Sequence, residues 1–292
     1  MYEDTWHRDG AIFHEEGNAT ELIAGQVVKW IGEKRAPWFI YVPFHAVHIP
    51  VDAPDKYKQL YAGVKFHDDP AKHDSRLRLG AFVSQMDAEI GGFIAALEKT
   101  GQRQNTLVVF TSDNGGQEKG GNSYVGKTPG LPLGSNNTPL CGMKNQLYEG
   151  GIRVCAFANW PGTLAPRKVT APMHAVDWFP TISAVAGYQP ARELKWDGMD
   201  MWPALTGAVA KPEPRTILWR ATTGNAIRSG DWKLFITKSG QGELFNLADD
   251  PYERNDRAAA ESQRVEALRA QMQELRKDDV TKLPPDLEGL PH

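Results

Sequence analysis

The sequence lacks the features that mark several specialised classes of protein. Its 292 residues include only two cysteines, so we expect no disulfide framework, and we expect Cys141 and Cys155 to be free, mostly buried thiols. No apolar run approaches the roughly 18 residues that a membrane span requires. No apolar stretch at the N-terminus indicates a signal peptide, so the sequence leaves the cellular location open.

The sequence also lacks an excess of charge of either sign. Lysine and arginine total 33, aspartate and glutamate total 36, and the net charge is −3. Without a basic excess we expect no nucleic-acid partner, and without an apolar span we expect no membrane association. Apolar residues make up 41% and charged residues 24%, which is ordinary for a globular protein of one large or two modest domains.

The most informative segment is residues 107–116, with the sequence LVVFTSDNGG. Its four apolar residues are typical of a strand buried on both faces, as in parallel sheets. Asp113 and Asn114 follow at the C-terminal end, where open α/β sheets place ligands, and their oxygen atoms suit Ca²⁺ or Mg²⁺. The same residues also occur in plain turns, so this segment alone does not decide between a metal site and a turn.

Two further segments carry polar residues at the ends of apolar runs. Residues 38–42 predict another strand, which leads to His45 and His48. Residues 142–151 form a glycine-rich loop that contains Lys144 and precedes a third apolar run at 152–158. If the three segments meet at one sheet edge, their polar side chains form a single site.

The order of these motifs resembles the sulfatase family of the alkaline-phosphatase superfamily. A His-x-Pro loop at 48–50 comes first, then Asp-Asn-Gly-Gly at 113–116, then Lys144 followed by Tyr-Glu-Gly-Gly-Ile-Arg-Val at 148–154. The resemblance extends from about residue 2 to about residue 275. It is strongest to arylsulfatases that act on sulfated sugars or aryl sulfates.

The resemblance implies a role for each candidate residue. Asp113 and Asn114 correspond to ligands of the family's divalent cation, usually Ca²⁺, with Mg²⁺ or Mn²⁺ as alternatives. His48 corresponds to the histidine that contacts the sulfate group and the leaving group, and Lys144 to the lysine that binds a sulfate oxygen. His45 either shares the substrate-binding site or lies on the surface. The implied partner is a small ester or a sulfated substrate.

The sequence departs from the family pattern in its early motifs. Sulfatases begin with a strand that carries two adjacent aspartates, followed by a Cys-or-Ser-x-Pro-x-Arg motif whose first residue becomes formylglycine, the nucleophile. Neither is found here, because Gly-Met-Lys follows Cys141 and Ala-Phe-Ala follows Cys155. The chain therefore resembles the C-terminal two-thirds of a sulfatase. We expect no formylglycine and a weakly held cation, because two side-chain ligands are few.

The implied fold is α/β, alkaline-phosphatase/sulfatase-like and truncated at its N-terminus. We expect a mostly parallel central sheet flanked by helices in residues 1–210, including helices at 20–34 and 75–100. Short apolar runs separated by turns predict four antiparallel strands in residues 211–292, at 216–221, 226–229, 232–237 and 243–247. A helix at 261–275 and a loose tail complete this smaller domain.

Two classes of function fit these observations. The first is an ester hydrolase that cleaves sulfate, phosphate or carboxyl esters weakly or promiscuously, with His48 and Lys144 as catalytic residues. The alternative is a non-catalytic sulfatase fragment or an anion-binding module that needs an N-terminal partner. Because the absent strands would leave apolar sheet edges exposed, we also expect a homo-oligomer, most simply a dimer.

Overall fold

The computed structural model describes residues 6–34, 37–120, 132–209, 213–277 and 279. The chain divides into two compact units, and each is described here by itself. The first unit consists of residues 1–111, 116–136 and 156–166, and the second of residues 112–115, 137–155 and 167–292. The expected domain boundary near residue 210 stays a prediction, and most of the expected tail, residues 280–292, lies outside the described residues.

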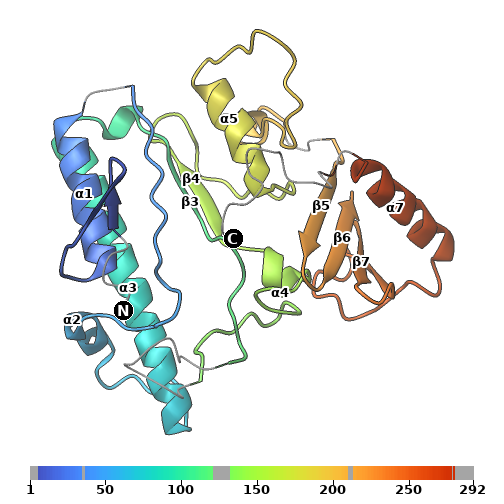
Figure 1. The fold of residues 1–292 in the computed structure, drawn as a ribbon, viewed down its shortest axis with the longest axis horizontal. Coiled ribbons are helices and arrows are strands. Elements are labelled where there is room, and N and C mark those ends of the chain that lie inside the picture. Colours follow the sequence, from blue (N-terminus) through green and yellow to red (C-terminus); the bar gives the residue numbers. More distant parts are fainter. Residues whose placement is uncertain (1–5, 35–36, 121–131, 210–212, 278, 280–292) are drawn as a thin grey trace. The chain divides into compact units, whose positions relative to one another are not determined.

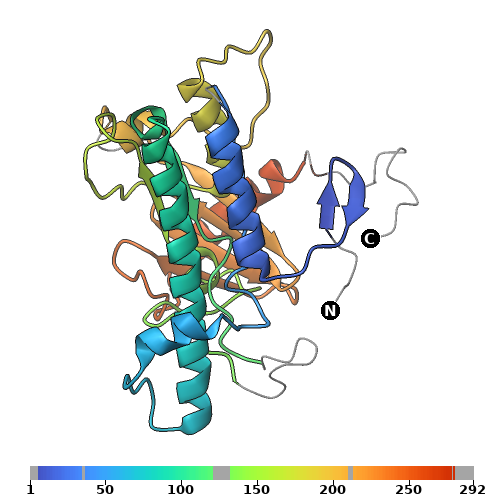
Figure 2. The same cartoon turned by 90° about the vertical axis from the view of Figure 1, so that its left-hand side faces the viewer.

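Two long helices dominate the first unit. α1 (Ala19–Glu33) begins at Asn18 and α3 (Pro70–Lys99) begins at Asp69, and each of these side chains accepts two backbone N–H hydrogen bonds from the first turn. Figure 2 shows the two helices side by side. Both predicted helices are confirmed, but α3 starts five residues early because Pro70 occupies its first turn, where its fixed φ and missing N–H are tolerated.

Three short helices of the first unit pack against α3. A core cluster of Val51, Ala53, Tyr57, Ala81 and Phe82 joins α2 (Asp55–Lys58) to α3. The remaining elements are an antiparallel hairpin, short helices and a pair of strands: β1 (Trp6–Arg8), β2 (Ala11–Phe13), α2 (Asp55–Lys58), η1 (Gln59–Tyr61), η2 (Arg103–Asn105), β3 (Val108–Thr111) and β4 (Ala156–Asn159).

The expected parallel central sheet is not confirmed. β3 pairs antiparallel with β4, and every strand pairing among the described residues is antiparallel (Figure 1). Residues 38–42 form no strand, and Phe39 and Tyr41 are 67% and 77% exposed. An apolar run predicts an extended, buried segment, but it does not show whether the neighbouring strand runs parallel or antiparallel.

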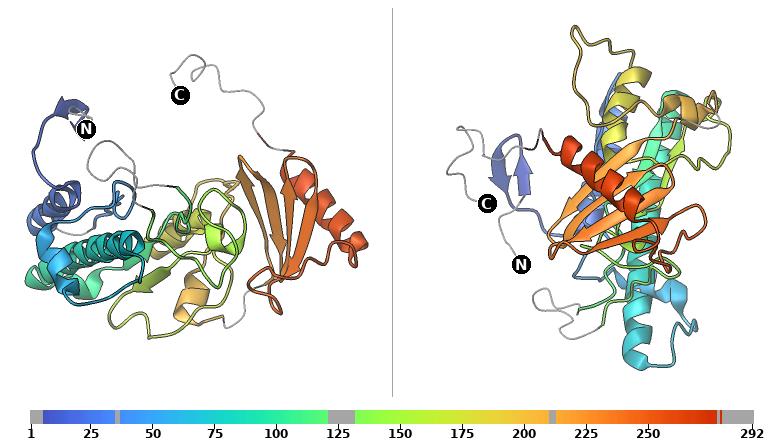
Figure 3. Two further views of the ribbon diagram at one scale, coloured as in Figure 1. Left: turned by 90° about the horizontal axis from the view of Figure 1, so that it is seen from below. Right: turned by 90° about the vertical axis from the view of Figure 1, so that its right-hand side faces the viewer.

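The second unit contains the predicted C-terminal sheet and helix. Its four antiparallel strands lie in the order β5-β6-β7-β8, and α7 (Ser262–Leu275) packs on one face of the sheet (Figure 3). Leu234 and Leu244 from the strands and Leu268 and Met272 from the helix are buried between them. The strands are β5 (Thr216–Ala221), β6 (Gly224–Ser229), β7 (Trp232–Thr237) and β8 (Gly242–Asn246).

Short helices precede this sheet along the chain. Asp177 is fully buried and accepts hydrogen bonds from the backbone N–H groups of His174 (2.7 Å) and Met199 (3.0 Å). It also forms an ion pair with Arg215, which ties the short helices to the start of β5. These helices are α4 (Glu149–Ile152), η3 (Ala175–Asp177), α5 (Trp178–Val185) and α6 (Trp202–Thr206). None of the helices in the described ranges has the length and apolar character of a membrane span.

Candidate functional site

Asp113 and Asn114 form a compact acid–amide pair just after β3. The Asp113 carboxylate atom Oδ1 accepts hydrogen bonds from the backbone N–H of Asn114 (2.8 Å) and from its side-chain Nδ2 (2.9 Å). The other carboxylate oxygen and the Asn114 amide oxygen accept no hydrogen bond from a described residue. Asp113 is exposed and Asn114 is half-buried, so the free carboxylate oxygen of Asp113 is accessible to a ligand.

The acid–amide pair is held in place by backbone contacts between glycines. The Gly115 N–H donates to the Gly151 carbonyl oxygen (2.9 Å), and the Ser112 N–H donates to the Cys155 carbonyl oxygen (3.1 Å). A Cβ atom at position 115 would overlap the Gly150 carbonyl oxygen. Glycine at 115 therefore permits a close approach of two backbones that any side chain would prevent.

Lys144 lies in a loop that is held by two backbone hydrogen bonds. The Gly150 N–H donates to the Cys141 carbonyl oxygen (2.6 Å), and the Gln146 N–H donates to the Met143 carbonyl oxygen (2.9 Å). The Lys144 side chain is half-buried and forms no ion pair with a described residue. The Lys144 loop and the segment with the acid–amide pair therefore both form hydrogen bonds with one stretch of backbone, residues 150–155.

Both cysteines flank this arrangement. Cys141 and Cys155 are free, as predicted. Cys141 is half-buried, but Cys155 is exposed, so the expectation of two mostly buried thiols is wrong for the second. Cys155 directly precedes β4, and three of the four residues of β4 are exposed. The apolar run at 152–158 therefore predicted more burial than the structure has.

A buried ionic network lies beneath the Lys144 loop. The Lys233 ammonium, fully buried in β7, is 2.8 Å from Glu149 Oε1 and 2.7 Å from Glu253 Oε1. The Glu149 backbone N–H also donates to Glu253 Oε2 (2.6 Å). Burial raises the pKa of Glu253, while the Lys233 ammonium acts in the opposite direction. We name these three residues the Lys233 network.

Tyr148 adds a second contact between the motif and the C-terminal sheet. Its hydroxyl donates to Glu243 Oε2 (2.6 Å), and its ring lies 5.1 Å from Phe235 and 6.3 Å from Phe245 in edge-on geometry. Burial, together with the hydrogen bond to the Glu243 carboxylate, raises the pKa of Tyr148 above its ordinary value. The Tyr-Glu-Gly-Gly motif is therefore anchored through its first two side chains.

The two histidines belong to the first unit. The His48 N–H donates to the His45 carbonyl oxygen (2.7 Å), so both lie in one turn, and Val47 and Ile49 pack against the core of α2 and α3. His48 Nδ1 is 3.0 Å from the Ile49 carbonyl oxygen; with the proton on Nδ1, Nε2 is available to exchange a second proton. Both imidazoles are exposed. Their meeting with Asp113, Asn114 and Lys144 stays a prediction.

Comparison with known proteins gives a consistent result. A family model described as Sulfatase matches residues 1–188. The chain belongs to the sulfatase family. It is 26% identical to arylsulfatase J of Mus musculus and 34% identical to a sulfatase of Formosa agariphila, over 88% and 84% of this chain and 48% and 46% of those proteins.

The fold is shared with solved sulfatase-family structures as well. The structure named Ps i-CgsB, in complex with k-i-k-neocarrahexaose, has a TM-score of 0.77 and 28% identity. The match covers 93% of this chain and 58% of that one. The chain therefore spans about half the length of the relatives it matches and has the sulfatase-type fold across most of its own length.

Members of the sulfatase family generally bind a divalent cation, and the acid–amide pair fits that requirement in chemistry. Asp113 and Asn114 offer oxygen donors with no hydrogen bond to a described residue. They do not fit it in number, because no cluster of three or more His, Cys, Asp or Glu side chains suited to a metal occurs among the described residues. That Asp113 and Asn114 bind the cation stays a prediction.

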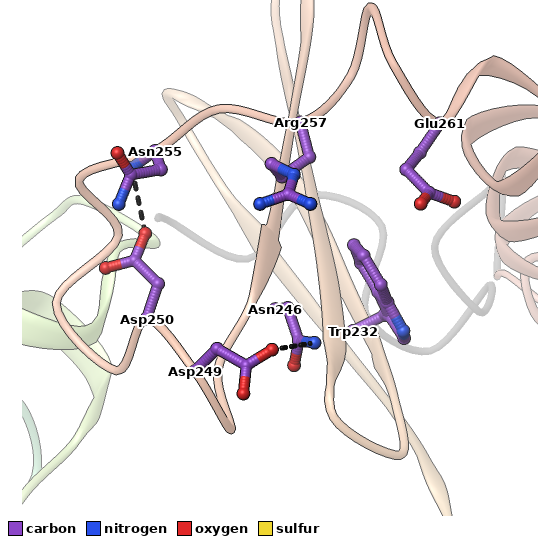
Figure 4. Close-up of a pocket in the computed structure, with 7 residues that line it drawn as sticks. All are labelled: Trp232, Asn246, Asp249, Asp250, Asn255, Arg257 and Glu261. Carbon is purple, nitrogen blue, oxygen red and sulfur yellow. Dashed lines mark hydrogen bonds between the residues drawn. The ribbon is translucent and has the colours of Figure 1, made fainter.

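A separate cavity of about 160 Å³ lies on the C-terminal sheet (Figure 4). Two of its carboxylates are already hydrogen-bonded, Asp249 by the Asn246 side-chain amide (2.9 Å) and Asp250 by the Asn255 backbone N–H (2.8 Å). It contains none of the residues that the sequence predicts for the site. Its lining is Trp232, Asn246, Asp249, Asp250, Asn255, Arg257 and Glu261.

The raised pKa of Tyr148 predicts a pH-dependent contribution to stability. Because the pKa is raised in the folded state, this contribution is complete below about pH 10 and is lost as the pH rises through the folded-state pKa. We expect Tyr148→Phe to lower the free energy of unfolding by about 1–2 kcal/mol at pH 8, with a smaller difference above pH 10. Urea unfolding between pH 8 and pH 11 measures this.

The matched control for that experiment is Tyr41→Phe, because the Tyr41 side chain is 77% exposed. Its unfolding should follow the wild-type curve at every pH. If Tyr148→Phe also followed the wild-type curve, the hydrogen bond to Glu243 would not contribute to stability.

Proposed function

We propose that this chain is an ester hydrolase of the sulfatase family that cleaves sulfuric esters weakly. One observation carries the proposal: backbone hydrogen bonds around Gly115, Gly150 and Gly151 bring the acid–amide pair and the Lys144 loop together in a chain of that family. Oxygen ligands for a cation, together with an ammonium group that forms no ion pair with a described residue, would suit an anionic substrate.

Each residue has a defined task in this proposal. Displacing an alcohol from a sulfate monoester leaves negative charge on the equatorial oxygens and on the departing oxygen. The Lys144 ammonium binds one equatorial oxygen, and protonated His48 gives a proton from Nε2 to the departing oxygen. Asp113 and Asn114 would hold the cation, Ca²⁺ or alternatively Mg²⁺ or Mn²⁺, and the cation would supply Lewis-acid polarisation of the sulfate group.

For residues 1–292 by themselves we expect a low rate, because the printed sequence contains no formylglycine motif. With water or another side chain as the nucleophile, the reaction lacks an activated covalent attack. Lys144 and His48 stabilise any tetrahedral or trigonal oxyanion, so phosphate and carboxyl esters are further candidate substrates. Ps i-CgsB was solved with a neocarrahexaose, and arylsulfatase J is named for aryl substrates, so sulfated sugars and aryl sulfates are the substrate classes to test first.

The hydrolase proposal predicts that two variants lose turnover. His48→Ala removes the proton donor and Lys144→Ala removes the anion contact, so we expect each to lower kcat/KM for nitrophenyl sulfate about 10- to 100-fold. EDTA should lower turnover as well, and added Ca²⁺ should restore it. Circular dichroism of each variant establishes that it is folded.

Exposed residues outside the site provide the matched controls for these two variants. His7→Ala and Lys238→Ala change the same residue types at exposed positions, and we expect wild-type turnover in both. Unchanged turnover in folded His48→Ala and Lys144→Ala would remove both residues from the mechanism. That result would also leave His45 without a neighbouring catalytic group.

The alternative function is an anion-binding module or a fragment that needs an N-terminal partner. A cation held by Asp113 and Asn114, together with the Lys144 ammonium, would bind sulfate without a nucleophile to attack it. Titration of the protein with sulfate and Ca²⁺ by calorimetry distinguishes the two. Binding that depends on Lys144 in the absence of any turnover would support the module.

We also propose that the chain forms a dimer through the β3–β4 region of its first unit. A two-stranded sheet is marginal by itself, and Phe157 of β4 is 52% exposed although its ring stacks on Phe110 at 5.1 Å. A second copy could extend this pair toward the larger, mostly parallel sheet expected from the sequence. Light scattering should give twice the chain mass.

The dimer proposal is tested by a charge at the exposed ring. We expect Phe157→Lys to shift the light-scattering mass toward the monomer, because it places an ammonium group in the apolar contact. Tyr188→Lys, at a position that is 50% exposed in the second unit, is the control and should remain dimeric. A wild-type monomer at high protein concentration would contradict the proposal.

A further inference from the structure

Lys233 is the most unusual side chain of the second unit. It lies inside β7 between apolar neighbours and is fully buried, with Glu149 7% exposed and Glu253 0% exposed beside it. Burying three ionisable groups gives little or no net stability compared with a well-packed apolar cluster. Conformational specificity therefore explains this buried ionic network better than stability does, because its hydrogen bonds are satisfied in only one arrangement of the segments.

The arrangement that it specifies is the start of α4. Glu149 is the first residue of that helix, and the network holds it twice, through its carboxylate at Lys233 and through its backbone N–H at Glu253. Since α4 has no side-chain cap, Glu253 supplies the acceptor that a capping residue would provide. The position of α4 along the sheet is therefore fixed by charge-assisted hydrogen bonds.

The two residues after Glu149 carry the contacts of the candidate site. The Gly150 N–H binds the Cys141 carbonyl oxygen, which closes the Lys144 loop, and the Gly151 carbonyl oxygen accepts the Gly115 N–H. A shift of α4 along its axis would break both hydrogen bonds at once. The acid–amide pair and the Lys144 ammonium would then lose their shared support.

We propose that the Lys233 network positions the acid–amide pair and the Lys144 loop relative to each other. Lys233, Glu149 and Glu253 are positioning residues, because they act through α4 and touch neither the cation nor the sulfate. This inference deepens the proposed function and rests on it for the identity of the ligands, whereas the geometry it describes can be measured without turnover.

The test uses Glu149→Ala, which removes the ion pair between Lys233 and α4 and leaves Lys233 paired with Glu253. Hydrogen–deuterium exchange is followed in peptides covering residues 112–116 and 149–152. We expect exchange there to rise at least about tenfold while the strands β5–β8 keep wild-type protection. Calorimetry with Ca²⁺ alone should show an affinity at least tenfold lower than that of the wild type.

Two more variants complete the experiment. Glu149→Gln keeps an oxygen toward the Lys233 ammonium and should restore most of the protection. Glu149→Asp shortens the side chain by one methylene and should show a smaller rise in exchange at residues 112–116; it decides the question if Glu149→Ala does not fold. Lys238→Met, at an exposed position, is the matched control and should exchange as the wild type does.

Three outcomes would overturn the proposal. They are wild-type exchange at residues 112–116 in folded Glu149→Ala or Glu149→Asp, an equal rise throughout β5–β8, and a Glu149→Gln variant as unprotected as Glu149→Ala. Failure of the proposed function looks different. In that case the wild type neither binds Ca²⁺ nor turns over nitrophenyl sulfate, and the exchange pattern still reports whether the network positions α4.

Discussion

The second unit depends on one interaction, the Lys233 ammonium buried between Glu149 and Glu253. Removing the lysine would leave two buried carboxyl groups without the ammonium that binds them both, although Glu149 would keep Arg153 at 4.0 Å. The Lys233 network joins three segments, at β7, at the start of α4 and after β8. Because α4 carries Gly151, which binds the backbone of Gly115 next to the acid–amide pair, the Lys233 network supports the candidate site without touching it.

A second constraint is the close approach of backbones around three glycines. Gly115, Gly150 and Gly151 lie where a Cβ atom would overlap a neighbouring carbonyl oxygen, so no other residue type fits without a shift of the chain. Backbone groups have fixed positions and lose little conformational freedom in forming such contacts. The glycines therefore fix the backbone positions of a site whose side chains lie in loops, and the Lys233 network holds α4 in place.

Local patterns in the sequence predicted the elements that depend on local physics. The helix at 262–275 and the strands at 216–221 and 232–237 follow the predicted bounds, since turns and apolar periodicity mark them. The sequence also singled out the acid–amide pair and Lys144, because their order along the chain resembles a family pattern; their role in one site stays a prediction. It misplaced the strand at 38–42, where apolar composition did not lead to pairing.

The Lys233 network could not be predicted, because its members are far apart along the chain. Glu149 and Glu253 lie 84 and 20 residues from Lys233, and a lysine in a strand is usually on the exposed face. The one available signal was a lysine directly before the apolar residues at 234–236. Likewise, the antiparallel pairing of β3 and β4 depends on the path of the long connection between them. No short segment of the sequence determines that path.

The central claim is that the acid–amide pair and the Lys144 loop form one site for a cation and an anion. Paramagnetic broadening of backbone amide signals by Mn²⁺ in the presence of sulfate tests it most directly, because broadening falls steeply with distance from the ion. The account predicts that residues 112–116 and 142–146 broaden together at the lowest Mn²⁺ concentrations. Broadening centred on Asp249 and Asp250, or confined to 112–116 alone, would contradict it.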